Sequence, residues 1–242
     1  NIARRLEISG DLNGIAAMTA LSKLNPVAHG AYIKWGDFEL ASNTMETLFS
    51  YEPTTRRIAS FPIKGTCERR EDELPSSPRA QEMLATPKER AEHVMIVDLV
   101  RNDLGRISKT GSVKVDALWD VEQYETVNQM TSTISSEIRK DTQLVELFTS
   151  LFPCGSITGA PKARTMQIIA ELECSPREVY TGCIGYISPG GDARFSVAIR
   201  TVVIDKTSGE AEFGVGGGVT YDSSPEGEYN ECLVKAQVLS GR

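Results

Sequence analysis

Hydrophobic and polar positions alternate with the period of a β-strand in several stretches of the chain. Residues 31–36 and 38–42 alternate in this way, and a Gly-Asp pair separates them, which predicts a β-hairpin. Further strand-like runs are predicted at residues 111–115, 127–134, 182–188, 195–204 and 210–220.

Helical periodicity is found in segments that lie between these strands. The first predicted helix covers residues 87–104, and Thr86 with Glu89 indicates a capping box at its start. Other helices are predicted at residues 142–152, 161–173 and from 224 towards the C-terminus. The polar, proline-bearing stretch 71–87 is predicted to be a loop. Strands and helices without a regular βαβ alternation indicate an α+β fold with largely antiparallel sheets.

The length of 242 residues, with 40% hydrophobic residues, is sufficient for one large domain or two small ones. No linker interrupts the chain, so residues 1–242 are interpreted as one domain. Asn1 begins inside a strand-like run. We therefore expect that the N-terminal part of this domain is missing.

The overall charge and the cysteine pattern narrow the class of protein. A net charge of −7 and a pI near 5.1 argue against a nucleic-acid-binding surface. Five cysteines without a Cys-x-x-Cys spacing, and only two histidines, do not fit the usual zinc sites, so reduced thiols in the cytoplasm are expected. No apolar run approaches the length of roughly 20 residues that spans a membrane, so no membrane association is expected.

Lys64 lies in the heptapeptide 61–67, where it is predicted to sit on a tight bend at the end of a strand, directly before Gly65. A single lysine in such a turn is most often a solvated surface charge. The alternative is a nucleophile, which requires a neutral amine in a defined position. Its neighbours in the sequence favour this alternative.

Two predicted helices each carry a Glu-x-x-Glu pair, Glu89 with Glu92 and Glu228 with Glu231. Residues three apart share one face of a helix. Mg²⁺ binds one or two protein carboxylates and accepts the remaining oxygens from water and substrate. The alternative is an ordinary helix face, on which Glu231 pairs with Lys235 and the other glutamates favour helix N-termini.

Glycine-rich segments suggest sites where backbone approaches a ligand. Residues 155–159 precede Pro161 as a loop whose N–H groups could bind an anion, a carboxylate as readily as a phosphate, because the Walker pattern is absent. Residues 214–218 place glycines inside a strand, which indicates close approach of a ligand or tight sheet packing. Arg200, inside a predicted strand, is either a carboxylate clamp or an outward-facing residue.

Four motifs together resemble the chorismate-utilising enzymes. They are Pro-Ile-Lys-Gly-Thr at 62–66, Met-Ile-Val-Asp-Leu-Val-Arg-Asn-Asp-Leu-Gly-Arg at 95–106, Gly-Ser-Ile-Thr-Gly-Ala-Pro-Lys at 155–162 and Pro-Glu-Gly-Glu-Tyr-Asn-Glu-Cys at 225–232. This family includes anthranilate synthase component I, the isochorismate and salicylate synthases, and aminodeoxychorismate synthase component I. The resemblance covers nearly the whole chain and implies sheets packed face to face with helices outside.

Within this family, a lysine at position 64 resembles the aminodeoxychorismate synthase branch, since the other branches carry alanine there. The resemblance implies that chorismate and ammonia form 4-amino-4-deoxychorismate, the precursor of p-aminobenzoate and folate. It also implies a glutamine amidotransferase, as a partner subunit or a fused domain. Lys64 matches the nucleophile, and Glu46 matches the general acid.

The same resemblance implies roles for the remaining candidate residues. Glu92 and Glu231 match Mg²⁺ ligands, and Glu89 and Glu228 match the second carboxylate of each pair. The positions that match substrate-binding groups are Thr158, Tyr180, Arg200, Gly216 and Lys235.

Two segments depart from the family pattern. Thr44 and Met45 precede Glu46 where the family has Ser-Pro, and Asn128 with Gln129 replaces a histidine near the substrate. Two alternatives therefore stay open: anthranilate synthase component I, which Lys64 argues against, and a non-catalytic remnant that binds chorismate or a glutaminase partner.

Overall fold

A computed structural model describes residues 1–10, 12–24, 26–27, 29–70, 74–125 and 127–237 of the chain. It falls into two compact units. The first unit comprises Asn1–Met45, Ile157–Ile184 and Val197–Arg242, and the second comprises Glu46–Ser156 and Gly185–Ser196. The interpretation of residues 1–242 as one catalytic domain stays a prediction. None of the described helices is both long and apolar enough to cross a membrane.

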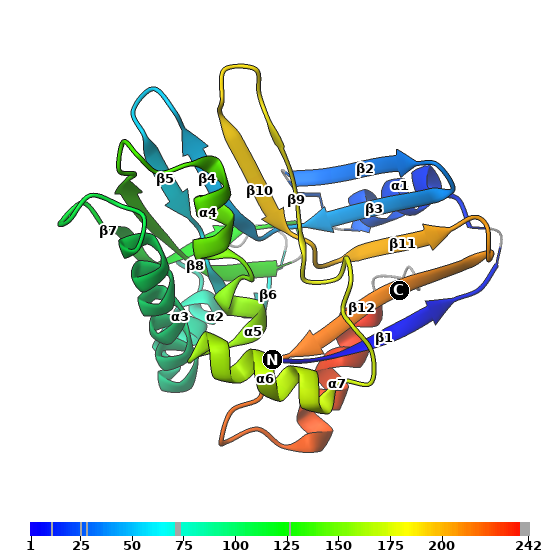
Figure 1. Ribbon diagram of the computed structural model, residues 1–242. Helices are drawn as coiled ribbons and strands as arrows, with labels where there is room; N and C mark the ends of the chain where they lie inside the picture. The colour runs from blue at the N-terminus through cyan, green and yellow to red at the C-terminus, as the bar shows by residue number, and fades with distance from the viewer. Residues whose placement is uncertain (11, 25, 28, 71–73, 126, 238–242) are drawn as a thin grey trace. The chain divides into compact units, whose positions relative to one another are not determined.

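A five-stranded sheet forms the first unit (Figure 1). Its strands in spatial order are β1 (Ile2–Ile8), β12 (Glu210–Gly217), β11 (Thr201–Asp205), β3 (Phe38–Thr44) and β2 (His29–Trp35). All neighbouring pairs are antiparallel. The predicted hairpin is confirmed, because β2 and β3 pair from His29↔Thr44 to Trp35↔Phe38.

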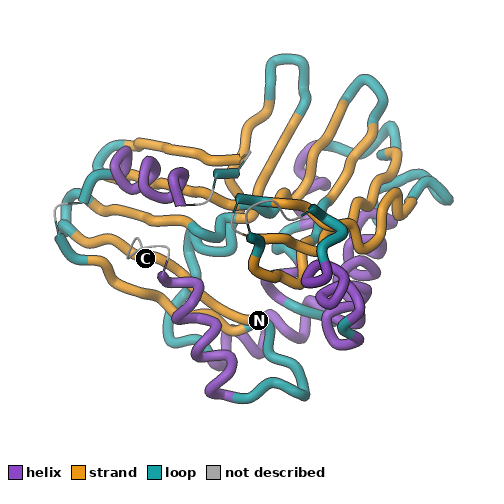
Figure 2. Tube along the Cα trace, turned by 180° about the vertical axis from the view of Figure 1, so that it is seen from behind, coloured by secondary structure: helices purple, strands orange, loops and turns teal. Residues whose placement is uncertain are grey.

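One face of this sheet carries the core of the first unit. Along β12 the side chains of Ala211, Phe213 and Val215 are buried, whereas the residues between them are not. Helices α1 (Gly14–Leu24) and α7 (Pro225–Ala236) both pack against this buried face, which Figure 2 shows from behind. Helix α6 (Lys162–Leu172) also belongs to this unit.

The second unit is built on a seven-stranded sheet. Its order is β6 (Ile63–Glu68), β8 (Val127–Glu137), β5 (Arg57–Ser60), β4 (Thr47–Glu52), β10 (Ala193–Val197) and β9 (Cys183–Ile187), with β7 (Lys114–Gln123) also paired to β8. The antiparallel α+β class predicted from the sequence is confirmed.

Helices cover the second sheet. They are α2 (Pro78–Ala85), α3 (Pro87–Gly105) and α4 (Leu144–Leu151), followed by the short α5 (Gly155–Thr158). Helix α3 contacts β6 and β8, and its buried residues His93, Ile96, Val97, Val100 and Leu104 recur at helical spacing. The helix predicted at 87–104 is therefore confirmed, and its polar first turn carries the first pair of glutamates.

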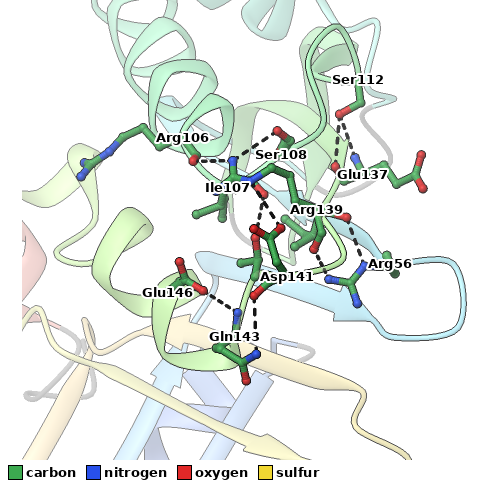
Figure 3. A network of polar contacts seen from close by, with 12 residues as sticks. Arg56, Arg106, Ile107, Ser108, Ser112, Glu137, Arg139, Asp141, Gln143 and Glu146 are labelled. Carbon is green, nitrogen blue, oxygen red and sulfur yellow. Dashed lines mark hydrogen bonds and ion pairs between the residues drawn. The ribbon is translucent and has the colours of Figure 1, made fainter.

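A network of polar contacts fixes the end of β8 against its neighbours (Figure 3). The Arg56 guanidinium donates hydrogen bonds to the carbonyl oxygens of Ile138 and Arg139, while the N–H of Ile138 donates to the Arg56 carbonyl at 2.8 Å. Arg139 donates to the Arg106 carbonyl, directly after α3, at 2.7 Å. These bonds satisfy carbonyls that the helix and strand ends leave unpaired.

Three local predictions were wrong. Part of the stretch 71–87 is helix α2, capped by Ser77, whose hydroxyl accepts from the N–H of Ala80; residues 71–73 lie outside the described residues. Thr86 makes no side-chain hydrogen bond to the start of α3, so the capping box is absent. The predicted strand 195–204 is two strands, β10 and β11, because Arg200 has φ of 52°.

Candidate active site

Lys64 lies inside β6, not on a bend that ends a strand. The register with β8 shifts between Ile63 and Thr66, so Lys64 and Gly65 form a bulge. Gly65 has φ of +80°, which favours glycine. A Cβ on Gly65 would lie only 3.3 Å from Oε2 of Glu89. The bulge therefore brings the backbone beside Lys64 close to a carboxylate of α3.

Glu46 is a buried carboxyl in the same unit, with 5% of its surface exposed. Burial raises its pKa above the ordinary value of a glutamate, and Ser156, Lys64 and Cys154 oppose this effect. Lys64 therefore interacts electrostatically with the carboxyl group that matches the general acid. A carboxyl with a raised pKa keeps its proton at higher pH, as a proton donor must.

His93 is a third ionisable group beside Lys64 and was not identified from the sequence. It is fully buried on α3, and its Nε2 lies 2.6 Å from Oγ of Ser132. Burial, and then the positive charge of Lys64, lowers its pKa to about 4. Its position four residues after Glu89 was a usable signal, because such residues share a helix face.

The first pair of glutamates lies at the start of α3. Glu89 and Glu92 are both half-buried, and the Lys88 ammonium lies 4.0 Å from Oε1 of Glu92. Glu89 points its Oε2 towards the Cα of Gly65. The helix thus brings a carboxylate to the strand that carries Lys64.

Asn128 and Gln129, which replace the family's histidine, are buried on β8. They pair in register with Cys67 and Thr66 of β6. The Asn128 amide lies 3.9 Å from the Cys67 sulfur, a weak contact. Both amides therefore lie next to the strand of Lys64, where an amide binds by hydrogen bonds but does not shuttle protons.

The second pair of glutamates, in the first unit, lies over the glycines of β12. A Cβ on Gly217 would lie 2.5 Å from Oε2 of Glu228 and 3.8 Å from Oε1 of Glu231. Ser223 donates a hydrogen bond of 2.5 Å to Oε1 of Glu228. Oε2 of Glu228 is buried and has no hydrogen-bond partner among the described residues. The glycine leaves room for both carboxylates and for one oxygen that lacks a donor.

Lys235 completes this group. Its ammonium donates to the carbonyl of Gly216 at 2.7 Å and to Oε1 of Glu231 at 2.5 Å. The helix-face pairing of Glu231 with Lys235 therefore exists, next to the glycine strand.

Arg200 and Tyr180 also belong to the first unit. Arg200 donates from Nη1 to the Lys235 carbonyl at 3.3 Å, and burial lowers the pKa of its guanidinium. The Tyr180 ring covers Gly214, where a Cβ would lie 2.1 Å from the ring. Burial raises the pKa of Tyr180 to about 12, so it stays a neutral hydrogen-bonding group. A tight contact with a side chain therefore explains Gly214.

The segment predicted as an open anion-binding loop contains the turn of helix α5, which ends at Thr158. Thr158 is buried, and Gly159 after it has φ of +133°. The extended loop before α6 is thus shorter than predicted. Thr158 as a substrate-binding residue stays a prediction.

The two carboxylate pairs offer oxygen ligands of the kind that Mg²⁺ prefers. Each pair supplies hard oxygen donors, and Gly217 with the unpartnered Oε2 of Glu228 leaves a space that an oxygen-seeking cation fits. No group of three His, Cys, Asp or Glu side chains suited to a metal occurs among the residues described. Since Mg²⁺ needs only one or two protein carboxylates, the pairs fit this ion.

The predicted residues named so far thus lie in two groups, one in each unit. Lys64, Glu46 and Glu89 lie together with His93 in the second unit. Glu228, Glu231, Lys235 and Arg200 lie together in the first unit, with Gly216 as a partner of Lys235.

Known proteins match nearly the whole chain. An aminodeoxychorismate synthase from Streptomyces griseus is 42% identical over 233 residues, which are 96% of this chain and 32% of that protein. An anthranilate synthase component 1 from Methanothermobacter marburgensis is 38% identical over 225 residues, or 93% of this chain and 48% of that protein. The chain therefore spans about a third to a half of the length of these relatives.

A solved structure shares the fold. The crystal structure of anthranilate synthase component I from Streptococcus pneumoniae matches with a TM-score of 0.88 and 33% identity, covering 100% of this chain and 52% of that one. The sequence profile of the chorismate binding enzymes matches residues 1–241. The chain therefore belongs to the chorismate binding enzyme family, as its motifs predict.

Proposed function

We propose that the protein containing this chain converts chorismate and ammonia to 4-amino-4-deoxychorismate in the cytoplasm, for p-aminobenzoate and folate synthesis. A glutamine amidotransferase, as a separate subunit or a fused domain, supplies the ammonia. Relatives that carry the aminodeoxychorismate synthase name support this activity, and so does the lysine at position 64. Relatives named anthranilate synthase have similar identity, so the choice depends on the site.

One observation carries the proposal: Glu46 is a buried carboxyl group that accepts a hydrogen bond from Ser156, and Lys64 of the same unit interacts with it electrostatically. A nucleophile that interacts with a carboxyl group of raised pKa suits a substitution that expels a hydroxyl group. A lysine provides the amine for such a covalent step, whereas an alanine at this position does not.

The proposed step balances as follows. The Lys64 amine forms a C–N bond to the chorismate ring, and the bond between C4 and its hydroxyl oxygen breaks. Glu46 gives its proton to the departing oxygen, so water leaves and the carboxylate remains. Ammonia then forms the new C–N bond and expels the Lys64 amine, which restores the enzyme after proton return.

The carboxylate pairs and the cationic side chains hold the substrate in this proposal. Mg²⁺, held by Glu92 and Glu231 with Glu89 and Glu228 beside them, would bind the ring carboxylate and spread its charge. The groups proposed to bind chorismate are Thr158, Tyr180, Arg200, Gly216 and Lys235.

Product analysis tests this function. The intact natural protein, given chorismate, Mg²⁺ and ammonium, is expected to form 4-amino-4-deoxychorismate without releasing pyruvate. Formation of anthranilate with release of pyruvate would instead establish the alternative enzyme. Binding of chorismate without any product would support a non-catalytic role.

A further inference from the structure

Two side chains that follow α4 enclose the carboxyl group of Glu46. Ser156 and Cys154 are 4% and 6% exposed, so both are buried with it. The Ser156 hydroxyl donates a hydrogen bond to Oε1 of Glu46. The Cys154 sulfur lies 3.8 Å from the same oxygen and 3.1 Å from Oγ of Ser156. Both donors therefore meet one oxygen of the carboxyl group.

The backbone holds these two donors in place. Gly155 separates them, and a Cβ there would lie 2.4 Å from Cδ2 of Leu99 on α3. The segment thus approaches α3 more closely than any residue with a side chain permits. Because α3 is long and its inner face is buried, this contact gives the donors a rigid support.

These two donors act on the charge of the carboxyl group. A hydrogen bond to a carboxylate favours its charged form, so the Ser156 hydroxyl lowers the pKa of Glu46, and the Cys154 thiol acts in the same direction. Lys64 from β6 is a charged group that also acts on this carboxyl.

We infer that Ser156, assisted by Cys154, is a positioning residue that holds the carboxyl group of Glu46 and stabilises the negative charge that this group gains when it gives up its proton. This inference rests on the proposed function, in which Glu46 is the proton donor. When the proton leaves, the carboxylate gains negative charge. The Ser156 hydrogen bond, already formed with Oε1, strengthens at that moment and stabilises the transition state.

The test compares Ser156→Ala with Ser150→Ala in the intact natural protein. Ser150 is an equally buried serine of the same unit, whose hydroxyl donates to the Asp103 carbonyl. Ser156→Ala is expected to lower kcat by about 10-fold to 100-fold, as expected when a hydrogen bond to a charged group is lost. KM for chorismate should change little, and Ser156→Thr should restore most of the rate.

The pH profile separates positioning from general damage. Activity falls above the pKa of the acid, and the Ser156 hydrogen bond lowers that pKa. Ser156→Ala should therefore move the alkaline limb of kcat to higher pH, and Cys154→Ala should move it less in the same direction. Unchanged limbs in both variants, with kcat equal to that of Ser150→Ala, would overturn the inference.

One further variant, Glu46→Gln, makes each outcome decisive. Glu46→Gln should lower kcat by roughly 10²-fold to 10⁴-fold if Glu46 is the proton donor. Full activity of Glu46→Gln would refute the acid role within the proposed function. If Glu46→Gln is inactive while Ser156→Ala behaves like the control, only the positioning role fails. If Ser156→Ala does not fold, the inference is tested by the position of the alkaline limb of kcat in Cys154→Ala and in Ser156→Thr.

Discussion

The two units present carboxyl groups in opposite surroundings. In the second unit, Glu46 is buried with hydroxyl and thiol donors, and its raised pKa favours the neutral acid. In the first unit, Glu231 is exposed and pairs with Lys235, while Glu228 lies half-buried over Gly217. Burial therefore makes the neutral acid more favourable at one glutamate, and exposure beside a glycine strand makes the others suitable for binding charge.

Lys64→Ala provides the strongest test of the site around Lys64 and Glu46 in the second unit. The rate of 4-amino-4-deoxychorismate formation should fall by at least about 10³-fold, because the nucleophile is lost. Binding of chorismate and Mg²⁺ should persist, since other residues provide it, and isothermal titration measures both. Lys109→Ala, which removes an exposed lysine of the same unit paired with Glu137, is the control. Turnover of Lys64→Ala at the parent rate would contradict the covalent role.

The pH dependence of the free energy of unfolding tests whether His93 is buried in its neutral form. The pKa of His93 is about 4 in the folded protein, whereas the ordinary value of 6.5 applies to the unfolded chain. The unfolded chain therefore binds the proton more readily. The free energy of unfolding should therefore decrease as pH falls from 6.5 towards 4, by about 3 kcal/mol from this residue.

Urea denaturation across this pH range measures the effect. His93→Asn should lose that part of the pH dependence, whereas His29→Asn, in the first unit, should retain it. Identical pH dependence in the His93 variant and the parent would show that His93 is not held neutral.

Glu231→Gln tests whether the glutamate pairs bind Mg²⁺. The Mg²⁺ concentration for half-maximal activity should rise by about 10-fold to 100-fold, and Glu92→Gln should act in the same direction. Glu226→Gln is the control, because this residue also lies on α7 but outside the pair. An unchanged Mg²⁺ requirement in both variants would leave the pairs as ordinary helix faces.

Gly217→Ala is expected to have the smallest effect in this group. The added Cβ would lie 2.5 Å from Oε2 of Glu228 and displace that carboxylate. The Mg²⁺ requirement should rise about tenfold or less, which activity titration detects. Gly105→Ala is the matched control, because a Cβ there meets nothing within 4 Å. Equal behaviour of the two variants would show that Gly217 does not provide space for the carboxylates.

Most of the long helices and strands could be predicted from the sequence, because each buries one face and its hydrophobic residues recur with the period of that face. Helix α3 and the hairpin of β2 and β3 follow the predicted ranges closely. The break at Arg200 was missed because only a backbone angle, and no turn residue such as glycine, marks it. Helix α2 was missed because a polar surface helix with proline at its start resembles a loop.

The candidate site was predicted by residue type but not by contacts. A sequence motif identified Lys64. The three-residue spacing within each pair identified the glutamates, because such spacing along a helix is visible in the sequence. The partners of Glu46 could not be deduced in the same way, because Ser156 lies 110 positions away in the chain. Contacts of this kind depend on the packing of α3 against the segment after α4.

The covalent role of Lys64 is the central claim, and peptide mass spectrometry tests it most directly. The natural protein is incubated with chorismate and Mg²⁺ without ammonia or glutamine, and the digest is then searched for modified peptides. The account predicts an added mass equal to chorismate minus water, on the peptide that contains Lys64 and absent from Lys64→Ala. An adduct on another residue, or undiminished product formation by Lys64→Ala, would contradict it.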